Sequence, residues 1–239
     1  MHFRYGTLIN CAAIVLAGIL GRFFGKRIKD RVREALTEIC GISVIFLAIA
    51  GAMEGMLSVE DGKLISQHSM MVVICLVLGT LLGELLNIEG GISRFGEWLK
   101  QKTGNAKDVS FVEAFITASC TVCIGAMAVI GSIEDGINGN WSILGVKSIL
   151  DFIIILVMTA SLGKGCAFSA ISVFLFQGCV TLLASLLSPL MTETALAYLS
   201  MIGNILIFCV GINLLFNRKL RVANMLPAIL FAVAAAFLP

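Results

Sequence analysis

Charged residues are scarce in this sequence. They make up 13% of its 239 residues, and 59% of the residues are hydrophobic, whereas a soluble domain has about 25% charged and about 45–50% apolar residues. The mean hydropathy is +1.01. This composition excludes a soluble globular domain of useful size. We therefore predict an integral membrane protein, with the lipid bilayer as its main partner and with no nucleic-acid partner.

Residue sets that carry out catalysis are also missing. The chain has two histidines, and it contains no His-Glu-x-x-His, no Gly-x-Ser-x-Gly and no Gly-x-x-x-x-Gly-Lys-Ser/Thr. The Gly-Lys-Gly at 163–165 is too short for a phosphate-binding loop. We therefore expect no enzyme activity, no cofactor and no ATP-driven pumping by this chain. Residues 1–25 also lack the charged head and the Ala-x-Ala exit of a cleavable signal peptide.

The eight cysteines all fall inside apolar runs, whereas disulfide scaffolds place cysteines in loops. We expect reduced thiols that contribute to packing. Cys120 and Cys123 have the spacing of a metal-binding or redox pair, but no second pair and no histidine accompanies them. No metal site is therefore predicted.

Apolar runs of about 20 residues can cross a bilayer, and the sequence contains about eight of them. We predict an all-α polytopic membrane protein with about eight transmembrane helices, forming a single transmembrane domain over residues 1–239. The expected spans are 7–25, 36–57, 68–87, 110–132, 142–162, 165–188, 196–216 and 223–238.

Basic residues indicate the orientation of these spans. Fourteen of the 17 Lys and Arg residues fall in loops on one side of the expected topology, and the exceptions are Arg4, Lys63 and Lys147. Positively charged loops stay in the cytoplasm. We therefore expect both termini to face outward from the bacterial cytoplasmic membrane.

One phrase occurs twice in the chain. GAMEGMLSVEDG at 51–62 matches GAMAVIGSIEDG at 125–136 without a gap, at an offset of 74 residues. We interpret residues 6–62 and 68–136 as two copies of a helical hairpin that enter from the same side, followed by the spans of 142–238. Such an internal parallel helical-hairpin repeat is one plan of transporters.

The repeated phrase ends in Glu-Asp-Gly. In the repeat interpretation, Glu60 and Asp61 lie beside Glu134 and Asp135 at the outer face. The alternative is that Glu-Asp-Gly only ends a helix at the lipid headgroups.

Two further features accompany both copies. Ala17 with Gly21, and Gly79 with Gly83, have the small-x-x-x-small spacing that lets helix backbones approach closely. A basic amphipathic linker follows each pair, at 26–36 and at 92–102, with Trp98 expected at the membrane interface. The last two spans are weaker candidates for a third copy.

Glycines lie near the outer ends of the second and fourth spans: Gly51 and Gly55 in one, Gly125 and Gly131 in the other. Such glycines invite a helix break or close packing. Backbone opened at membrane depth persists only where protein or a water-filled cavity satisfies it. We therefore expect the second and fourth spans to pack together about a pseudo-two-fold axis, with the fifth span beside them.

Ionisable side chains at membrane depth usually face a cavity or a partner. Glu113 follows Ser110 with the spacing of a capping box, and Glu54 and Glu84 lie near span ends. Lys147 and Asp151 are explained neither by a helix cap nor by a span end, because Asp151 lies about 14 Å along its span. The two are four residues apart and share a helix face, so they form either a buried structural ion pair or part of a binding site.

Further polar residues lie in other spans. The full set of candidates for a solute or ion site is Asp151, Lys147, Gln177, Asp135, Glu134, Asp61, Asn10, Asn204 and Asn213.

Several motifs together resemble those of a known family. GTLIN (6–10), CIGAMAVIGSIEDG (123–136), KSILD (147–151), FQG (176–178) and RVANMLPA (221–228) are similar to the YqgA/YdfK-like bacterial inner-membrane protein family, a domain of unknown function to which transport is often ascribed. The resemblance covers essentially the whole chain. It implies a multi-span protein of the bacterial cytoplasmic membrane and no particular substrate.

Two functions remain open. The first is a secondary transporter or channel for a small polar solute or ion, working by alternating access or gating at Asp151 and Lys147. The second is a non-transporting scaffold or signalling component that acts through the basic linkers. Because several small-x-x-x-small faces are present, we also expect a homo-oligomer.

Overall fold

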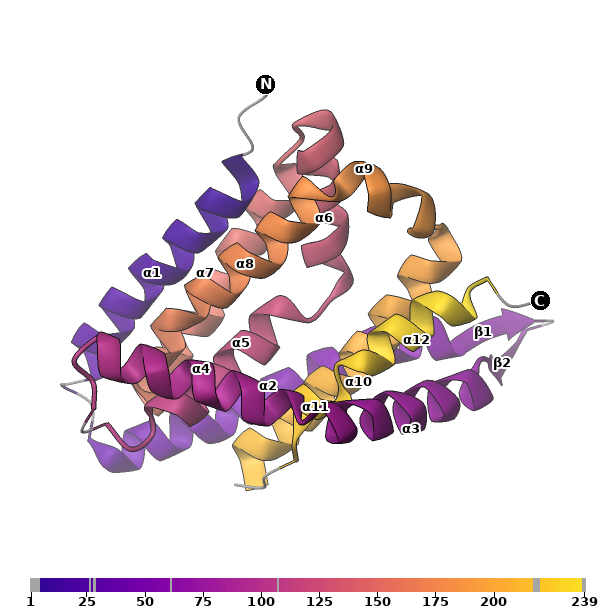
Figure 1. The fold of residues 1–239 in the computed structure, drawn as a ribbon. Coiled ribbons are helices and arrows are strands. Elements are labelled where there is room, and N and C mark those ends of the chain that lie inside the picture. Colours follow the sequence, from indigo (N-terminus) through magenta and orange to yellow (C-terminus); the bar gives the residue numbers. More distant parts are fainter. Residues whose placement is uncertain are drawn as a thin grey trace.

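The long apolar segments form helices, because in lipid a helix satisfies its own backbone hydrogen bonds. The computed structural model describes residues 5–25, 27, 29–60, 62–106, 108–216 and 220–237. Within this part of the chain, six helices are long and apolar enough to cross a membrane. They lie in α1 (Tyr5–Gly25), α2 (Asp30–Met56), α3 (Ser69–Leu86), α7 (Ser142–Leu162), η1 with α8 (Lys164–Phe168 and Ser169–Leu182) and α10 (Glu193–Phe216) (Figure 1).

Shorter elements connect these helices. They are β1 (Leu57–Glu60), β2 (Lys63–Ser66), α4 (Ile88–Lys102), α5 (Phe111–Cys123), α6 (Ala126–Asn138), α9 (Ala184–Leu187), η2 (Ser188–Leu190), α11 (Val222–Met225) and α12 (Pro227–Ala235). Helices α5 and α6 together pass the same test as one span with a bend of 63°.

The predicted class, an all-α polytopic membrane protein, is confirmed. The described helices give six spans, or seven if the bent pair is one span. The count of eight stays a prediction, because the apolar stretch Val222–Ala235 is shorter than the other spans.

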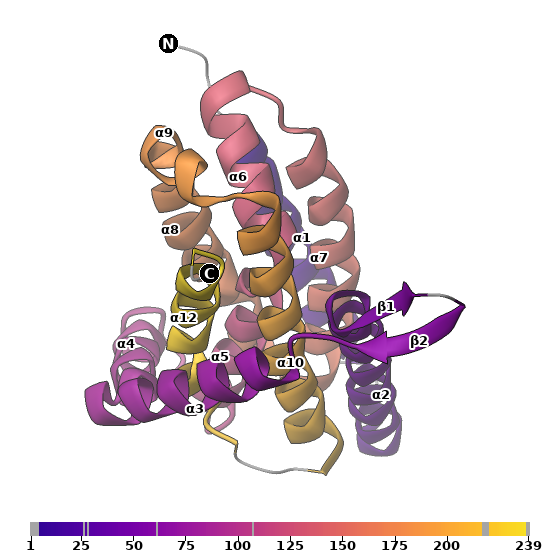
Figure 2. The same cartoon turned by 90° about the vertical axis from the view of Figure 1, so that its right-hand side faces the viewer.

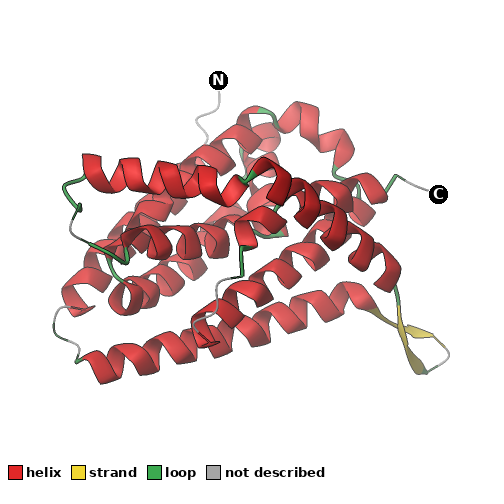
Figure 3. Cartoon of the chain, turned by 60° about the horizontal axis from the view of Figure 1, so that its bottom comes forward, coloured by secondary structure: helices red, strands yellow, loops and turns green. Residues whose placement is uncertain are grey.

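A small β-hairpin connects α2 to α3, and Figure 3 shows it projecting beyond the helices. Leu57 pairs with Ser66 and Glu60 pairs with Lys63 in antiparallel register. Gly62 has a positive φ of 73° in the turn. The first Glu-Asp-Gly therefore falls in a hairpin turn, with Asp61 itself outside the described residues. It does not end a helix, because α2 ends earlier, at Met56.

The second Glu-Asp-Gly lies within a helix. Residues 134–136 belong to α6, which continues to Asn138. The alternative that the phrase ends a helix is thus wrong at the first position, whereas at the second the phrase lies in the last turn of α6, where the N–H of Gly139 bonds to the carbonyl of Glu134. The two copies also differ before the phrase, since α2 is continuous while residues 111–138 are broken.

The helices pack in pairs that are distant in the sequence. Helix α1 lies along α7, α2 along α10, and α3 against α11 and α12 (Figures 1 and 2). The predicted close approach at Gly79 and Gly83 is present: the two glycines lie against the backbone of Ala228 and of Asn224. A side chain on either glycine would overlap these atoms.

The second and fourth spans do not pack together as expected. Helix α10 lies between them, since its Asn204 contacts Gly51 of α2 and its Gly203 contacts Ile124 beside Gly125. The reason is that α2 uses its small-residue face against α10. The prediction of a direct packing of these spans about a shared axis is therefore wrong.

The linkers after α1 and α3 also differ from each other. The first continues directly into α2, which starts at Asp30, whereas the second forms the separate helix α4. The apolar face of α4 packs against Phe111 and Phe115 of α5, with Leu99 buried there. Trp98 is exposed and stacks on Phe95 at 5.8 Å.

The close contact of α3 with α11 generates a test. Gly83→Ala should lower the stability of the folded protein by about 1–3 kcal/mol, because the added methyl group overpacks the contact with the Asn224 carbonyl. The measurement is the thermal unfolding midpoint in detergent. Gly178→Ala in α8 is the matched control, since a Cβ there meets no atom within 4 Å. Equal midpoints for the two variants would contradict the packing.

Candidate functional site

The bend between α5 and α6 opens the backbone inside the protein. Helix α5 ends at Cys123, and Gly125 adopts φ 138° and ψ 152° before α6 begins. A positive φ of this size is open to glycine and strained for other residues. The last carbonyl groups of α5 therefore lack the partners that a continuous helix would supply.

The side chain of Lys147 satisfies this open helix end. Its Nζ atom donates to the carbonyl oxygen of Val122 at 2.8 Å and to Oδ2 of Asp151 at 2.6 Å. The side chains of Lys147 and Asp151 are 8% and 5% exposed. A cation is favoured there because a helix C-terminus carries partial negative charge.

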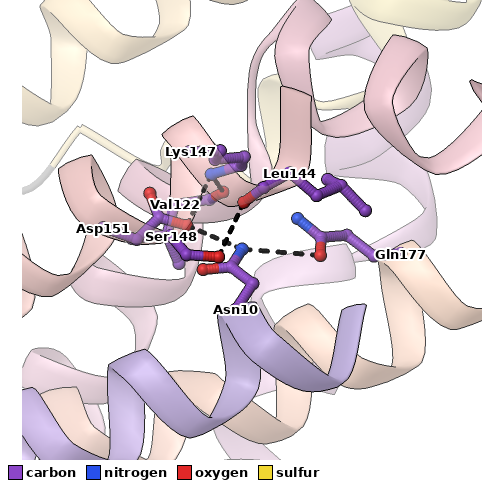
Figure 4. A network of polar contacts seen from close by, with 7 residues as sticks. All are labelled: Asn10, Val122, Leu144, Lys147, Ser148, Asp151 and Gln177. Carbon is purple, nitrogen blue, oxygen red and sulfur yellow. Dashed lines mark hydrogen bonds and ion pairs between the residues drawn. The ribbon is translucent and has the colours of Figure 1, made fainter. Parts of the chain in front are cut away.

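Two amide side chains extend the contact to other helices. Nδ2 of Asn10, on α1, donates to Oδ2 of Asp151 at 2.9 Å and to Oε1 of Gln177, on α8, at 3.4 Å. Figure 4 shows Asn10 pointing between Asp151 and Gln177. We call Asn10, Lys147, Asp151, Gln177 and the Val122 carbonyl the deep network.

The deep network has unused hydrogen-bonding capacity. Asn10 and Gln177 are fully buried, and neither Oδ1 of Asn10 nor Nε2 of Gln177 has a partner within the described residues. A buried polar group without a partner costs free energy. One acceptor and one donor are thus available beside the ion pair.

The other predicted site residues lie elsewhere. Asn204 bonds to Ser200 of its own helix, and Asn213 closes a loop by two hydrogen bonds with the backbone of Leu220. Glu134 accepts a hydrogen bond from Asn138. Within the described part of the chain, none of these three residues forms a hydrogen bond with the deep network. Asp61 lies outside the described residues.

Asp135 is a separate buried carboxylate. It is 1% exposed on α6 and faces α1, where a Cβ on Gly6 would lie 3.1 Å from its Oδ2 atom. Glu60 and Asp61 were predicted to lie beside Glu134 and Asp135. The side chain of Glu60 and the whole of Asp61 lie outside the described part of the chain. The structure thus unites Asn10, Lys147, Asp151 and Gln177 from the predicted set.

A cavity of about 720 Å³ opens at the end of the molecule where α2, α4 and α5 begin and where α7 and α10 end. Four carboxylate side chains line it, and we call it the acidic cavity: Glu34, Glu38, Glu89 and Glu113. Its lining reaches Thr117 and Cys120 in the second half of α5.

Sequence reasoning missed this cavity. Glu113 was expected in a capping box with Ser110, but the Ser110 hydroxyl instead donates to Asp108 at 3.1 Å and makes no cap. Glu34 fell in the linker of 26–36 and Glu38 in the expected span of 36–57, although their spacing of four places them on one helix face. That spacing was the available signal.

Glu89 is half-buried at the start of α4. Burial raises the pKa of its carboxyl group, while the backbone of Ala223 and the guanidinium of Arg221 oppose the rise. The carboxylate of Glu84 nearby adds to the rise. This group therefore loses its negative charge at a higher pH than an ordinary glutamate.

The described residues contain no group of three or more His, Cys, Asp or Glu side chains able to hold a metal ion. Cys120 and Cys123 lie on α5 beside the break, and both are free thiols. The geometry at this break is thus one of hydrogen bonds and an ion pair.

Comparisons with known proteins agree along the whole chain. The family described as protein of unknown function (DUF554) matches residues 5–237. The chain is 26% identical over 233 residues to the uncharacterized membrane protein YdfK of Bacillus subtilis (strain 168), which covers 98% of this chain and 96% of YdfK. It is 27% identical over 232 residues to the uncharacterized protein YqgA of Escherichia coli (strain K12), covering 95% and 94%. No solved structure matches the chain significantly.

The buried pair generates a second test. Lys147→Met and Asp151→Asn should each destabilise the protein by about 3–5 kcal/mol, because each leaves one buried charge unpaired. The double variant should recover part of that loss, with a coupling energy of about 2 kcal/mol or more. Unfolding by denaturant in detergent measures the four free energies.

The control cycle uses Lys164→Met and Asp108→Asn, whose charged atoms are 3.8 Å apart and more exposed. Its coupling should stay below about 1 kcal/mol. Additive losses in the Lys147–Asp151 cycle would show that this pair does not form.

Proposed function

We propose that this chain, which belongs to the family described as protein of unknown function (DUF554), is a secondary transporter or channel. Its substrate would be a small polar solute or ion that crosses the bacterial cytoplasmic membrane. The membership agrees with the resemblance of the sequence motifs and with a multi-span membrane protein. Neither fact concerns transport, so the proposal rests on the geometry of the deep network.

The observation that carries the proposal is the Lys147 ammonium group, shared between Asp151 and the open end of α5. Transporters often place substrate and coupling-ion sites at broken helices, where open carbonyls and helix ends bind ions. A protein that only needed stability would be served as well by a continuous helix and an apolar core.

Access to the network supports the same function. The acidic cavity reaches Cys120, and the deep network begins at the carbonyl of Val122 in the same helix turn. The last turn of α5 is therefore a wall between the cavity and the ion pair. A movement of α5 relative to α7 would open or close this wall.

The scaffold alternative depended on free amphipathic linkers. The apolar face of α4 is already packed against α5, and the first linker is part of α2. These contacts leave less linker surface for a partner, which weighs against this alternative. Charge reversal of Lys100 and Lys102, with unchanged folding, would separate the two functions, because a transporter should tolerate it.

The decisive test is uptake into vesicles that contain the purified protein. A panel of labelled amines, amino acids, small carboxylates and alkali cations is offered to the wild type. Asp151→Asn should abolish uptake of whichever compound enters, because the carboxylate is the charge that holds the network together. Size-exclusion chromatography checks that the variant remains folded.

Asp108→Asn is the control, because Asp108 is a partly exposed carboxylate paired with Lys164 outside the network. It should transport at the wild-type rate. An unchanged rate in folded Asp151→Asn would remove Asp151 from the mechanism. Absence of uptake for every compound of the panel would overturn the proposed function.

A further inference from the structure

We infer that the transported species is a small organic cation with a primary ammonium group, and this inference rests on the proposed function. In it, the acidic cavity collects the cation, and the deep network binds its ammonium group in place of that of Lys147. Two observations, one on the cavity and one on the deep network, lead to this substrate class.

The first observation is the negative charge of the residues that line the cavity. No Lys or Arg is among the described residues that line it, whereas four glutamates are. The described residues near the ends of the spans include basic ones: Arg27 between α1 and α2, Lys100 in the last turn of α4, and Lys164 at the start of η1. A cleft of one sign with low-dielectric walls concentrates ions of the opposite sign. The cavity therefore favours cations over anions.

Glu89 has a hydrogen bond with the backbone of Ala223 and lies near the guanidinium of Arg221, and the other three cavity carboxylates are Glu34, Glu38 and Glu113. None of them forms an ion pair within the described part of the chain. Glu84, just outside the cavity, differs, because its carboxylate pairs with Arg221 at 2.8 Å. Within the described residues, the negative charge of Glu34, Glu38 and Glu113 is thus not neutralised by an ion pair.

The acceptors of the deep network are the second and independent observation. The Val122 carbonyl and the Asp151 carboxylate both accept from one ammonium group, that of Lys147. The unpartnered Oδ1 of the fully buried Asn10 belongs to the same network. An ammonium group has three donors, and a free primary amine offers the same group without the tether.

Other cations fit these groups less well. Calcium takes six to eight oxygen ligands, and magnesium requires near-octahedral coordination, while the described oxygen acceptors here are few. A quaternary ammonium has no N–H to donate. The unpartnered Nε2 of Gln177 further suits a ligand that carries an acceptor, such as a hydroxyl group, beside its amine.

The exchange also follows from the shape of Lys147. Its charge sits on a flexible four-carbon stem, so the ammonium can leave the site while the helix stays in place. When a free ammonium binds Asp151, the buried carboxylate remains paired, and the displaced Lys147 ammonium must reach water or other acceptors, because an unpaired buried ammonium is also costly. The last turn of α5 then separates the cavity from the occupied site.

The experiment measures uptake of labelled methylammonium and ethanolamine into vesicles of phosphatidylcholine and phosphatidylglycerol. The wild type should take up both with saturation, and tetramethylammonium and sodium should not compete. Glu34→Gln with Glu38→Gln should raise KM about tenfold with little change in kcat, since the cavity concentrates the cation. Glu97→Gln, an exposed carboxylate on α4 paired with Lys100 at 3.7 Å, should leave both parameters unchanged.

A second measurement does not depend on transport. Lys147→Ala leaves an ammonium-sized space beside Asp151, and methylammonium should raise its thermal midpoint by several degrees more than that of the wild type. Tetramethylammonium and sodium should not. Equal stabilisation by sodium would overturn the inference in favour of an alkali-cation site.

The outcomes separate the two proposals. Uptake of another compound of the panel, with neither uptake of nor competition by the amines, would overturn the substrate class and leave transport standing. Absence of all uptake would overturn both. Because the uptake arm uses the wild type, poor folding of Lys147→Ala leaves the inference testable.

Discussion

The contact between the Lys147 ammonium group and the open end of α5 is the interaction on which the arrangement of the centre depends. A helix break in lipid exposes carbonyl groups that cost free energy unless something satisfies them. Lys147 supplies a donor to Val122 and takes its counter-charge from Asp151. The break at Gly125, the position of α7 beside α5 and the orientation of Asn10 are therefore parts of one arrangement.

Lys147 and Asp151 can both be buried because their opposite charges are paired. One ammonium and one carboxylate are both almost fully buried, and removing either leaves a charge whose cost is several kcal/mol. Any rearrangement of the centre must therefore keep Asp151 paired. This constraint restricts the group that can replace the Lys147 ammonium beside Asp151 to another cation or a proton.

The acidic cavity adds a second level of charge organisation. The described basic residues of this end lie between the spans or in short connecting helices, where positive charge orients the spans, whereas glutamates of α2, α4 and α5 line the cavity. The same end of the protein thus presents opposite signs to the membrane surface and to the interior. Under the proposed function, the outer charge would orient the spans and the inner charge would attract a cationic ligand.

Part of this centre was predictable from the sequence. Lys147 and Asp151 share a helix face by their spacing of four, and their depth in an apolar run indicated that they need partners. The contacts of Asp151 with Asn10, 141 residues away, and of Lys147 with the Val122 carbonyl were not predictable. They depend on which helices become neighbours.

The repeated phrase also shows that the sequence alone does not predict tertiary contacts. Glu-Asp-Gly lies in a hairpin turn after α2 but within the helix α6, and Gly125 breaks a span where Gly51 does not. Gly51 instead packs against Asn204 of α10, so its helix stays continuous. The sequence by itself determined the membrane class, the helical content and the buried pair, because hydropathy and i, i+4 spacing are local properties. Only the tertiary structure decided the broken helix, the acidic cavity and the partners of the pair, because these depend on contacts between segments far apart in the chain.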